Sequence, residues 1–181
     1  MKATATHLPE VLVLDPRVFE DARGFFFESY NRRAFREAAG IDVEFVQDNQ
    51  SFSVRNVLRG LHYQLRQPQG KLVAVLAGEI FDVAVDLRRG SQTFGKCTAV
   101  NLSGGNHRML WIPPGFAHGF LVLSEHALVQ YKVSDYYAPQ DERTILWNDP
   151  DLAIAWPLEG DPIVSDKDAR GVAFKAAELF D

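Results

Sequence analysis

His62 is the residue whose neighbours say most about chemistry. It lies in the strand-like run VLRGLHYQ, residues 57–64, which also contains Arg59. An unperturbed imidazole titrates near ~6.5, so it can take up a proton at neutral pH. A guanidinium group suits anions such as a diphosphate, and Arg23, Lys71 and Lys167 offer further cations. The run therefore predicts acid–base chemistry on an anionic substrate.

A metal ion held by histidines is one alternative for this site. In β-barrels such an ion typically needs two histidines separated by one residue, a carboxylate and a third histidine from a later strand. Here Tyr63 and Gln64 follow His62, and only His118 remains of the later set. We therefore expect no metal ion. For His118 by itself, the alternative is a core histidine whose nitrogens are hydrogen-bonded by backbone groups.

A base that acts on a carbon acid needs two helpers. One is a carboxylate that orients its other nitrogen, and the other is a cation where the enolate oxygen gains charge. The sequence offers Asp168 or Asp82 as the carboxylate and Lys71 as the cation. If His62 is instead a structural residue packed on its strand, these helpers are not required.

Inversion at carbon also needs an acid on the opposite face of the substrate, and a tyrosine hydroxyl can serve. In residues 126–133, side chains alternate between two faces, so Tyr131 shares a face with Ala127, Val129 and Val133. This places Tyr131 toward an apolar interior. The alternative is an ordinary strand aromatic with a hydrogen-bonded hydroxyl.

The elements that must position these residues are mostly strands. Short runs rich in β-branched and aromatic residues alternate with turn residues, which predicts an all-β sandwich or barrel. The expected strands are Val11 to Leu14, Phe25 to Tyr30, Val43 to Gln47, Lys71 to Ala77, Glu79 to Leu87, Thr98 to Leu102, Phe120 to Leu123 and Ala127 to Val133. Helices are expected only at Asn31 to Ala39, ended by Gly40, and after Ser165 through Asp168.

Alternation also assigns faces within these strands. In residues 79–87 the set Phe81, Val83, Val85 and Leu87 is expected to face the core, opposite Asp82. A regular strand would send Arg59 and His62 to opposite faces, so both can line one pocket only if the register breaks. Gly60 between them predicts a β-bulge.

Length and composition limit the possible classes of protein. A chain of 181 residues and 20.3 kDa is expected to form one domain, and no apolar run approaches the ~18 residues that span a bilayer. The net charge of −5 argues against a nucleic-acid partner. A single cysteine, Cys97, and no recognisable secretory segment favour the cytoplasm.

Several motifs in order resemble those of the cupin-fold dTDP-4-dehydrorhamnose 3,5-epimerases. The resemblance covers nearly everything from Asp21 to Asp168. It is carried by DARGFF (21–26), QDN (47–49), LRGLHYQ (58–64), GKLV (70–73), WIPPGFAHGF (111–120), YK (131–132), DYYAP (135–139) and WNDP (147–150). Together and in this order the motifs are specific for the family, although no single motif is.

The resemblance implies a jelly-roll barrel that works as a homodimer without metal or organic cofactor. It implies one domain over residues 1–181, with the jelly-roll core at about 21–147 and a segment at 148–181 packed back on the barrel. The substrate would be dTDP-4-dehydro-6-deoxy-D-glucose, epimerised at C3 and C5 to dTDP-4-dehydro-L-rhamnose. Both carbons flank the C4 ketone, so a base can form an enolate at either.

Roles for individual residues also follow from the resemblance. His62 resembles the base, Asp168 its orienting partner, Tyr131 the acid and Lys71 the enolate-stabilising cation. Tyr137 matches the aromatic that stacks on thymine. Positions that line the nucleotide-sugar site are Arg23, Glu28, Gln47, Asn49, Arg59, His118, Glu142 and Lys167, with Arg23 and Glu28 supplied across the dimer by an exchanged strand.

Three hypotheses stay open at this point. The first is the 3,5-epimerase. The second is a related enzyme that inverts only C3 or only C5, or isomerises the ketone. The third is a non-catalytic barrel that binds sugar nucleotides, which would be expected to lack the base or the acid, whereas His62 and Tyr131 are both present.

Overall fold

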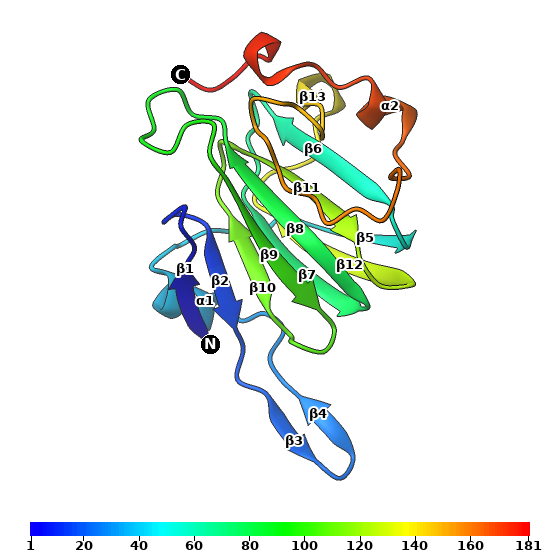
Figure 1. Ribbon diagram of the computed structural model, residues 1–181. Coiled ribbons are helices and arrows are strands. Elements are labelled where there is room, and N and C mark those ends of the chain that lie inside the picture. Colours follow the sequence, from blue (N-terminus) through cyan, green and yellow to red (C-terminus); the bar gives the residue numbers. More distant parts are fainter.

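The computed structural model describes residues 1–181 and consists mainly of β-strands (Figure 1). The strands are β1 (Lys2–Ala5), β2 (Leu12–Asp15), β3 (Phe19–Asp21), β4 (Gly24–Phe26), β5 (Gln47–Val54), β6 (Leu58–Gln64), β7 (Lys71–Ala77), β8 (Glu79–Asp86), β9 (Cys97–Ser103), β10 (Met109–Ile112), β11 (Phe116–Val122), β12 (His126–Val133) and β13 (Glu142–Thr144). The helices are α1 (Arg32–Ala39) and α2 (Asp166–Ala169), with 3-10 turns η1 (Pro139–Asp141) and η2 (Phe174–Ala176).

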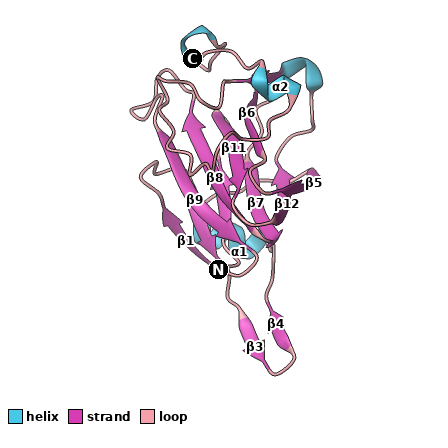
Figure 2. Ribbon diagram, turned by 45° about the vertical axis from the view of Figure 1, so that its right-hand side comes forward, coloured by secondary structure: helices cyan, strands magenta, loops and turns pink.

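Two antiparallel sheets face each other, as Figure 2 shows most clearly. One has the order β1-β2-β10-β7-β12-β5 and the other β13-β6-β11-β8-β9. From β5 to β13, each strand lies in the other sheet from the strand before it, except that β9 pairs with β8, and this is the crossed connectivity of a jelly roll. The all-β jelly-roll prediction is confirmed. The sheets begin earlier than residue 21, the expected start of the core, because β1 pairs with β2 and β2 pairs with β10.

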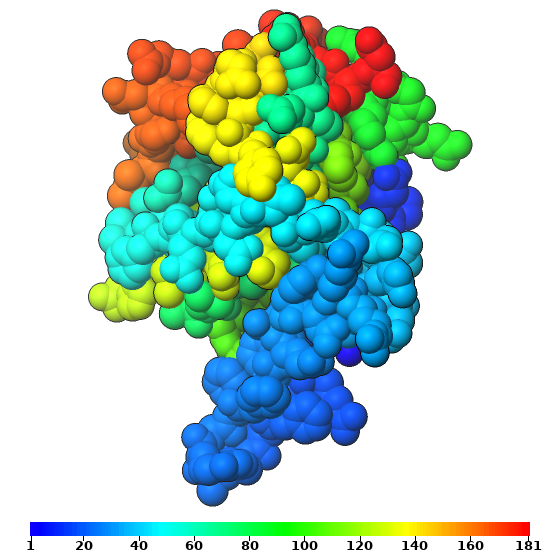
Figure 3. Space-filling view, turned by 180° about the vertical axis from the view of Figure 1, so that it is seen from behind, coloured from blue at the N-terminus to red at the C-terminus, as the bar shows by residue number.

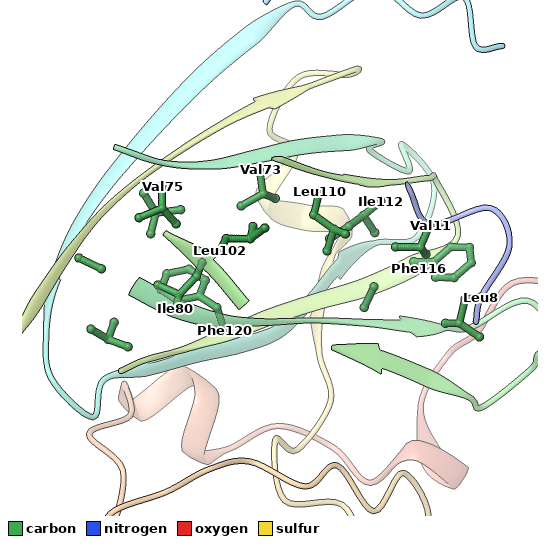
Figure 4. Packing of buried hydrophobic residues seen from close by; sticks show 14 residues of the cluster. Leu8, Val11, Val73, Val75, Ile80, Leu102, Leu110, Ile112, Phe116 and Phe120 are labelled. Carbon is green, nitrogen blue, oxygen red and sulfur yellow. The ribbon is translucent and has the colours of Figure 1, made fainter. Parts of the chain in front are cut away.

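The barrel interior is filled by apolar side chains from both sheets. In Figure 4, Val73 and Leu110 from the six-stranded sheet face Ile80 and Phe120 from the other sheet. Burying such side chains contributes about 25 cal/mol per Å² of apolar surface and is the main force that closes the sandwich.

Strand β8 is buried on both faces. Val83, Val85 and Leu87 are buried as expected, but they point away from the barrel interior and pack against the C-terminal part of the chain, which includes Leu152 and Phe174. The opposite face carries Asp82, which is fully buried within the barrel. Alternation alone could not separate the faces, because both are covered. We propose that residues 148–181 belong to the same single domain as the sheets they cover.

Local signals fix both helices. Asn31 accepts a hydrogen bond from the backbone N–H of Ala34 at 3.1 Å, and Gly40 ends α1 in the left-handed conformation with φ 70°. Ser165 accepts a hydrogen bond from the N–H of Asp168 at 3.1 Å and begins α2. Both helix predictions are confirmed.

The position of strand β5 was predicted incorrectly from the sequence. The expected strand at Val43 to Gln47 is wrong, since residues 41–46 have no regular structure, and the strand is the polar run QDNQSFSV that follows. Its pairing with β12 over the whole of both strands holds it in the sheet. Three of its inward-facing side chains, Gln47, Asn49 and Ser51, line a polar cavity, so no apolar stripe marks it.

A second departure concerns β4, which ends at Phe26 instead of continuing to Tyr30. With β3 it forms a two-stranded hairpin that projects away from both sheets, seen as the blue extension in Figure 3. Its apolar residues Phe19, Phe25 and Phe26 are 50%, 59% and 69% exposed. An isolated hairpin is marginally stable in water, and exposed aromatics of this kind mark a contact surface.

Candidate active site

A polar pocket of about 350 Å³ opens between the two sheets at one end of the barrel. Its wall carries ten of the residues singled out from the sequence: Gln47, Asn49, Arg59, His62, Lys71, His118, Tyr131, Tyr137, Glu142 and Lys167. They come from β5, β6, β7, β11 and β12 and from the segments around η1 and α2. The strand order places these elements side by side although they are far apart in the chain.

A break in the register between β6 and β11 lets Arg59 and His62 share this pocket. His62 pairs with His118, whereas Arg59 pairs with Phe120, so β6 contains one residue more than β11 across this stretch. Gly60 has φ 121°, and a Cβ there would lie 2.6 Å from Cα of Gly119. The predicted irregularity at Gly60 is confirmed, and only glycine fits this approach of two backbones.

His62 is paired with Asp168. Nε2 of His62 lies 2.5 Å from Oδ1 of Asp168, whose other oxygen accepts a hydrogen bond from the backbone N–H of Gly60 at 3.3 Å. A carboxylate acceptor assigns the imidazole proton to Nε2, which leaves the lone pair of Nδ1 free. Asp168 is 2% exposed, so water does not compete for this contact.

The pKa values of both His62 and Asp168 are shifted from their usual values. Burial lowers the pKa of His62 below its usual value, although the hydrogen bond and negative charge of Asp168 act in the opposite direction. Burial by itself would raise the pKa of Asp168, but the hydrogen bond and charge of His62 and the N–H of Gly60 outweigh it and lower that pKa. At neutral pH the arrangement is therefore a neutral imidazole held by a carboxylate.

The question of which carboxylate serves His62 has a clear structural answer. Asp82, the other candidate, is bonded instead to His118, with Oδ1 at 2.7 Å from Nε2. His118 is therefore held by a side-chain carboxylate, and the alternative of a histidine bonded by backbone groups is wrong. The second oxygen of Asp82 is buried without any partner.

Lys71 places a cation in the wall of the same pocket. Its side chain is buried and makes no hydrogen bond or ion pair with the chain. Burial lowers the pKa of Lys71 to about 8, against the attraction of Asp82 and Glu142. A buried ammonium group with free donors is costly unless a ligand oxygen meets it.

Tyr131 reaches the pocket from β12. Burial raises the pKa of its hydroxyl, with Arg59 pulling in the other direction. A phenol kept protonated in this way is available as a proton donor. Its ring packs at the edge of the interior cluster, as the alternation in residues 126–133 predicted.

Hydrogen bonds connect the polar residues at the mouth of the pocket. Glu142 accepts a hydrogen bond from the hydroxyl of Tyr137 at 3.0 Å and from Nζ of Lys167 at 2.9 Å. Gln47 donates to Asn49 at 2.8 Å and accepts from the N–H of Tyr137 at 3.1 Å. The exposed ring of Tyr137 is thereby held beside the entrance.

Three predicted residues do not line the pocket, and of these Asp168 contacts His62 directly, whereas Arg23 and Glu28 lie elsewhere in their own chain. Arg23 sits in the β3–β4 hairpin, 89% exposed, with its guanidinium bonded to Asp21. Glu28 accepts a hydrogen bond from Asn31 at 3.0 Å, at the start of α1. The fold of one chain does not bring either residue to His62.

Six pocket residues were not singled out from the sequence: Ser51, Tyr63, Gln64, Gln69, Gly119 and Phe120. Tyr63, Gln64, Gly119 and Phe120 lie within motifs that carry the resemblance, which was the available signal. Nowhere in the structure do three or more His, Cys, Asp or Glu side chains gather so as to hold a metal ion. None of the helices is long and apolar enough to cross a membrane.

Comparison with known proteins agrees with this geometry. Residues 5–176 match the family model described as dTDP-4-dehydrorhamnose 3,5-epimerase. A dTDP-4-dehydrorhamnose 3,5-epimerase from Pseudomonas aeruginosa is 61% identical over 180 residues, 99% of each chain. A crystal structure of a dTDP-6-deoxy-D-glucose-3,5-epimerase from Legionella pneumophila, in complex with dTDP-4-keto-L-rhamnose, has a TM-score of 0.96 and 50% identity, covering 99% of this chain and 97% of that one.

The name of a second similar structure gives a different stereochemical outcome. It is a 3'-monoepimerase from Streptomyces bikiniensis in complex with dTDP-quinovose, with a TM-score of 0.89 and 32% identity over 97% of this chain and 88% of that one. The fold and the pocket define a jelly-roll isomerase. Within that class, the chain belongs to the dTDP-4-dehydrorhamnose 3,5-epimerase family.

Proposed function

We propose that this chain converts dTDP-4-dehydro-6-deoxy-D-glucose to dTDP-4-dehydro-L-rhamnose by inverting C3 and C5. The observation that carries the proposal is the neutral His62, oriented by Asp168, in one pocket with Lys71 and Tyr131. Family membership and the ligand of the Legionella pneumophila structure support the substrate.

His62 is the base of the proposed mechanism. Its free Nδ1 takes the proton from C5 or C3, and the electron pair of the broken C–H bond moves into the bond to C4, so that the ketone becomes an enolate. The ammonium group of Lys71, which has no partner in the chain, faces the negative charge on the C4 oxygen. Such a donor acts where charge develops in the transition state.

Tyr131 completes the inversion. Its hydroxyl donates a proton to the same carbon from the opposite face as the C4 carbonyl re-forms. The resulting phenolate and imidazolium return to their starting states by proton exchange with solvent. The same cycle at the second carbon gives the doubly inverted product, and neither cycle consumes a metal ion or an organic cofactor.

Binding is assigned to the remaining pocket residues. Tyr137 stacks on thymine at the mouth, where its ring is held by Glu142. Arg59 and Lys167 face the diphosphate, because guanidinium and ammonium groups suit its charge. Gln47, Asn49 and His118 donate or accept hydrogen bonds along the rest of the nucleotide sugar.

The working unit is proposed to be a homodimer with an exchanged hairpin. The β3–β4 hairpin exposes three phenylalanines and carries Arg23 away from its own pocket. The outer face of the six-stranded sheet exposes Phe52, Val54 and Leu76. A second copy would cover these surfaces and would bring Arg23 and Glu28 to the partner's pocket. We place this enzyme in the cytoplasm, in keeping with its single unpaired Cys97.

The test is incubation of the ketosugar nucleotide with the protein in deuterated water, followed by NMR. Deuterium at both C3 and C5, with both centres inverted, is the expected result. His62→Ala should abolish exchange while dTDP still binds, because the base acts mainly on the transition state. Tyr131→Phe should permit exchange at C5 but impair formation of the inverted product.

The second candidate is epimerisation at a single centre. The similarity to the Streptomyces bikiniensis 3'-monoepimerase favours it, since the fold alone does not fix the number of inversions. Deuterium and inversion confined to one carbon would establish this alternative. The absence of exchange at either carbon, with intact nucleotide binding, would instead point to a binding protein.

A further inference from the structure

The inward face of β5 is a row of polar side chains. Its members are Gln47, Asn49, Ser51 and Ser53, which alternate with exposed residues along the strand. Gln47 and Asn49 are bonded to each other at 2.8 Å. Ser53 accepts a hydrogen bond from Nε of Arg59 at 3.1 Å. Three of the four therefore have partners in the chain.

Ser51 is the exception. Its Oγ is buried and has no hydrogen-bond partner, and the only other side-chain atom in this condition is Oδ2 of Asp82. Ser51 also lines the pocket. Buried hydroxyl groups are nearly always hydrogen-bonded, so an orphaned one in a pocket wall indicates a partner that the chain itself does not provide.

The position of Ser51 identifies the part of the substrate that it meets. It pairs with Val129, and its neighbour Asn49 pairs with Tyr131, the proposed acid. Gln47, which contacts Tyr137 at the thymine end, lies four residues away, or about 13 Å at ~3.3 Å per residue. Ser51 thus lines the part of the pocket that lies along β5 beyond Asn49, near the proposed acid and away from the thymine end.

We propose that the hydroxyl of Ser51 is a specificity contact that hydrogen-bonds an oxygen substituent of the substrate's sugar ring. This inference rests on the proposed function. It adds a residue that holds the sugar in register between base and acid, and it accounts for the single unpartnered hydroxyl of the β5 row.

The test compares Ser51→Ala with Ser124→Ala, a matched control outside the pocket. Oγ of Ser124 accepts from the N–H of Glu79 at 2.7 Å and donates to the carbonyl of His126 at 2.6 Å. Ser51→Ala removes no bond within the protein, so its Tm should stay the same or rise while kcat/KM for the ketosugar nucleotide falls about tenfold. Ser124→Ala should lower Tm and leave kcat/KM unchanged.

Binding of dTDP, measured by calorimetry, locates the contact. Ser51→Ala should bind dTDP as tightly as the wild type, within about twofold, since the hydroxyl meets the sugar. An equal loss of dTDP affinity and kcat/KM, or a kcat/KM within twofold of wild type, would overturn the inference. A wild type without turnover would instead refute the proposed function, so the two failures are distinguishable.

Discussion

Asp168, in the short helix α2, holds His62 in strand β6 across 106 positions of sequence, with 2.5 Å between Oδ1 and Nε2. Ser165 caps α2, and the backbone N–H of Gly60 bonds the second oxygen of Asp168. The carboxylate is thus fixed from its own helix and from the bulge in β6. One consequence is that the C-terminal segment sets the tautomer of the base.

Asp168→Asn should lower kcat by about 10³- to 10⁴-fold, the scale seen when a histidine loses its carboxylate and takes the wrong tautomer. The affinity for dTDP should stay within about twofold of wild type. Steady-state kinetics and calorimetry measure the two effects. Asp82→Asn is the matched control, because Asp82 serves His118, and a loss of kcat as large as that of Asp168→Asn would contradict the assignment of the base.

The value of kcat/KM should fall at both low and high pH. His62 acts as the neutral base and its pKa is lowered, so kcat/KM should rise with pH through an acid limb below about 6.5. Lys71 must be charged, so kcat/KM should fall as pH rises through about 8. A pH profile of kcat/KM checks both limbs, and a plateau that extends to pH 10 would exclude a charged Lys71.

Lys71→Met should stabilise the fold while lowering kcat. The pKa of Lys71 is about 8 in the folded chain against 10.5 for an unperturbed lysine, so the unfolded state binds the proton more tightly. Folding is therefore penalised at pH 7, and this penalty is relieved as pH rises from about 8 to about 10.5.

At pH 7 the expected gain for Lys71→Met is on the order of 2 kcal/mol, from about 1.4 kcal/mol per pKa unit with an allowance for lost packing. Urea unfolding at pH 7 and pH 10.5 measures the gain, which should shrink at the higher pH. A variant less stable than wild type at pH 7 would mean that the ammonium group is satisfied in the folded state.

Subunit mixing tests the exchanged hairpin. His62→Ala and Arg23→Ala should each be nearly inactive as homodimers. In a mixed dimer, one pocket combines an intact His62 with the partner's intact Arg23, so mixing after reversible dissociation should restore activity to about a quarter of wild type for random pairing. If Arg23 served the pocket of its own chain, every pocket would carry a defect and no activity would return.

Gly60→Ala should destabilise the fold by more than about 2 kcal/mol and reduce kcat, because the new Cβ meets Gly119 at 2.6 Å in a backbone conformation disfavoured for alanine. Gly160→Ala is the control, with φ 81° and nothing within 4 Å of the added Cβ. It should cost about 1 kcal/mol and leave kcat unchanged. Equal effects in both variants would show that strain alone matters at Gly60.

The sequence by itself determined much of this protein, because some signals are local. Asn31 with Gly40, and Ser165 before α2, define helix ends within a few residues, and the β-branched run at Lys71 to Ala77 matches β7 at both ends. The ordered motifs identified the family, and the resemblance identified ten of the residues that line the pocket. Such signals need no knowledge of distant parts of the chain.

Tertiary structure decided the rest. By residue type alone, Asp168 and Asp82 were equivalent partners for His62, and the fold placed one behind each histidine. Strand β5 had no apolar stripe to reveal it, because its inward face lines a polar pocket. The orphaned hydroxyl of Ser51 is a property of its surroundings, and a residue's surroundings are set by chain segments far from it in sequence.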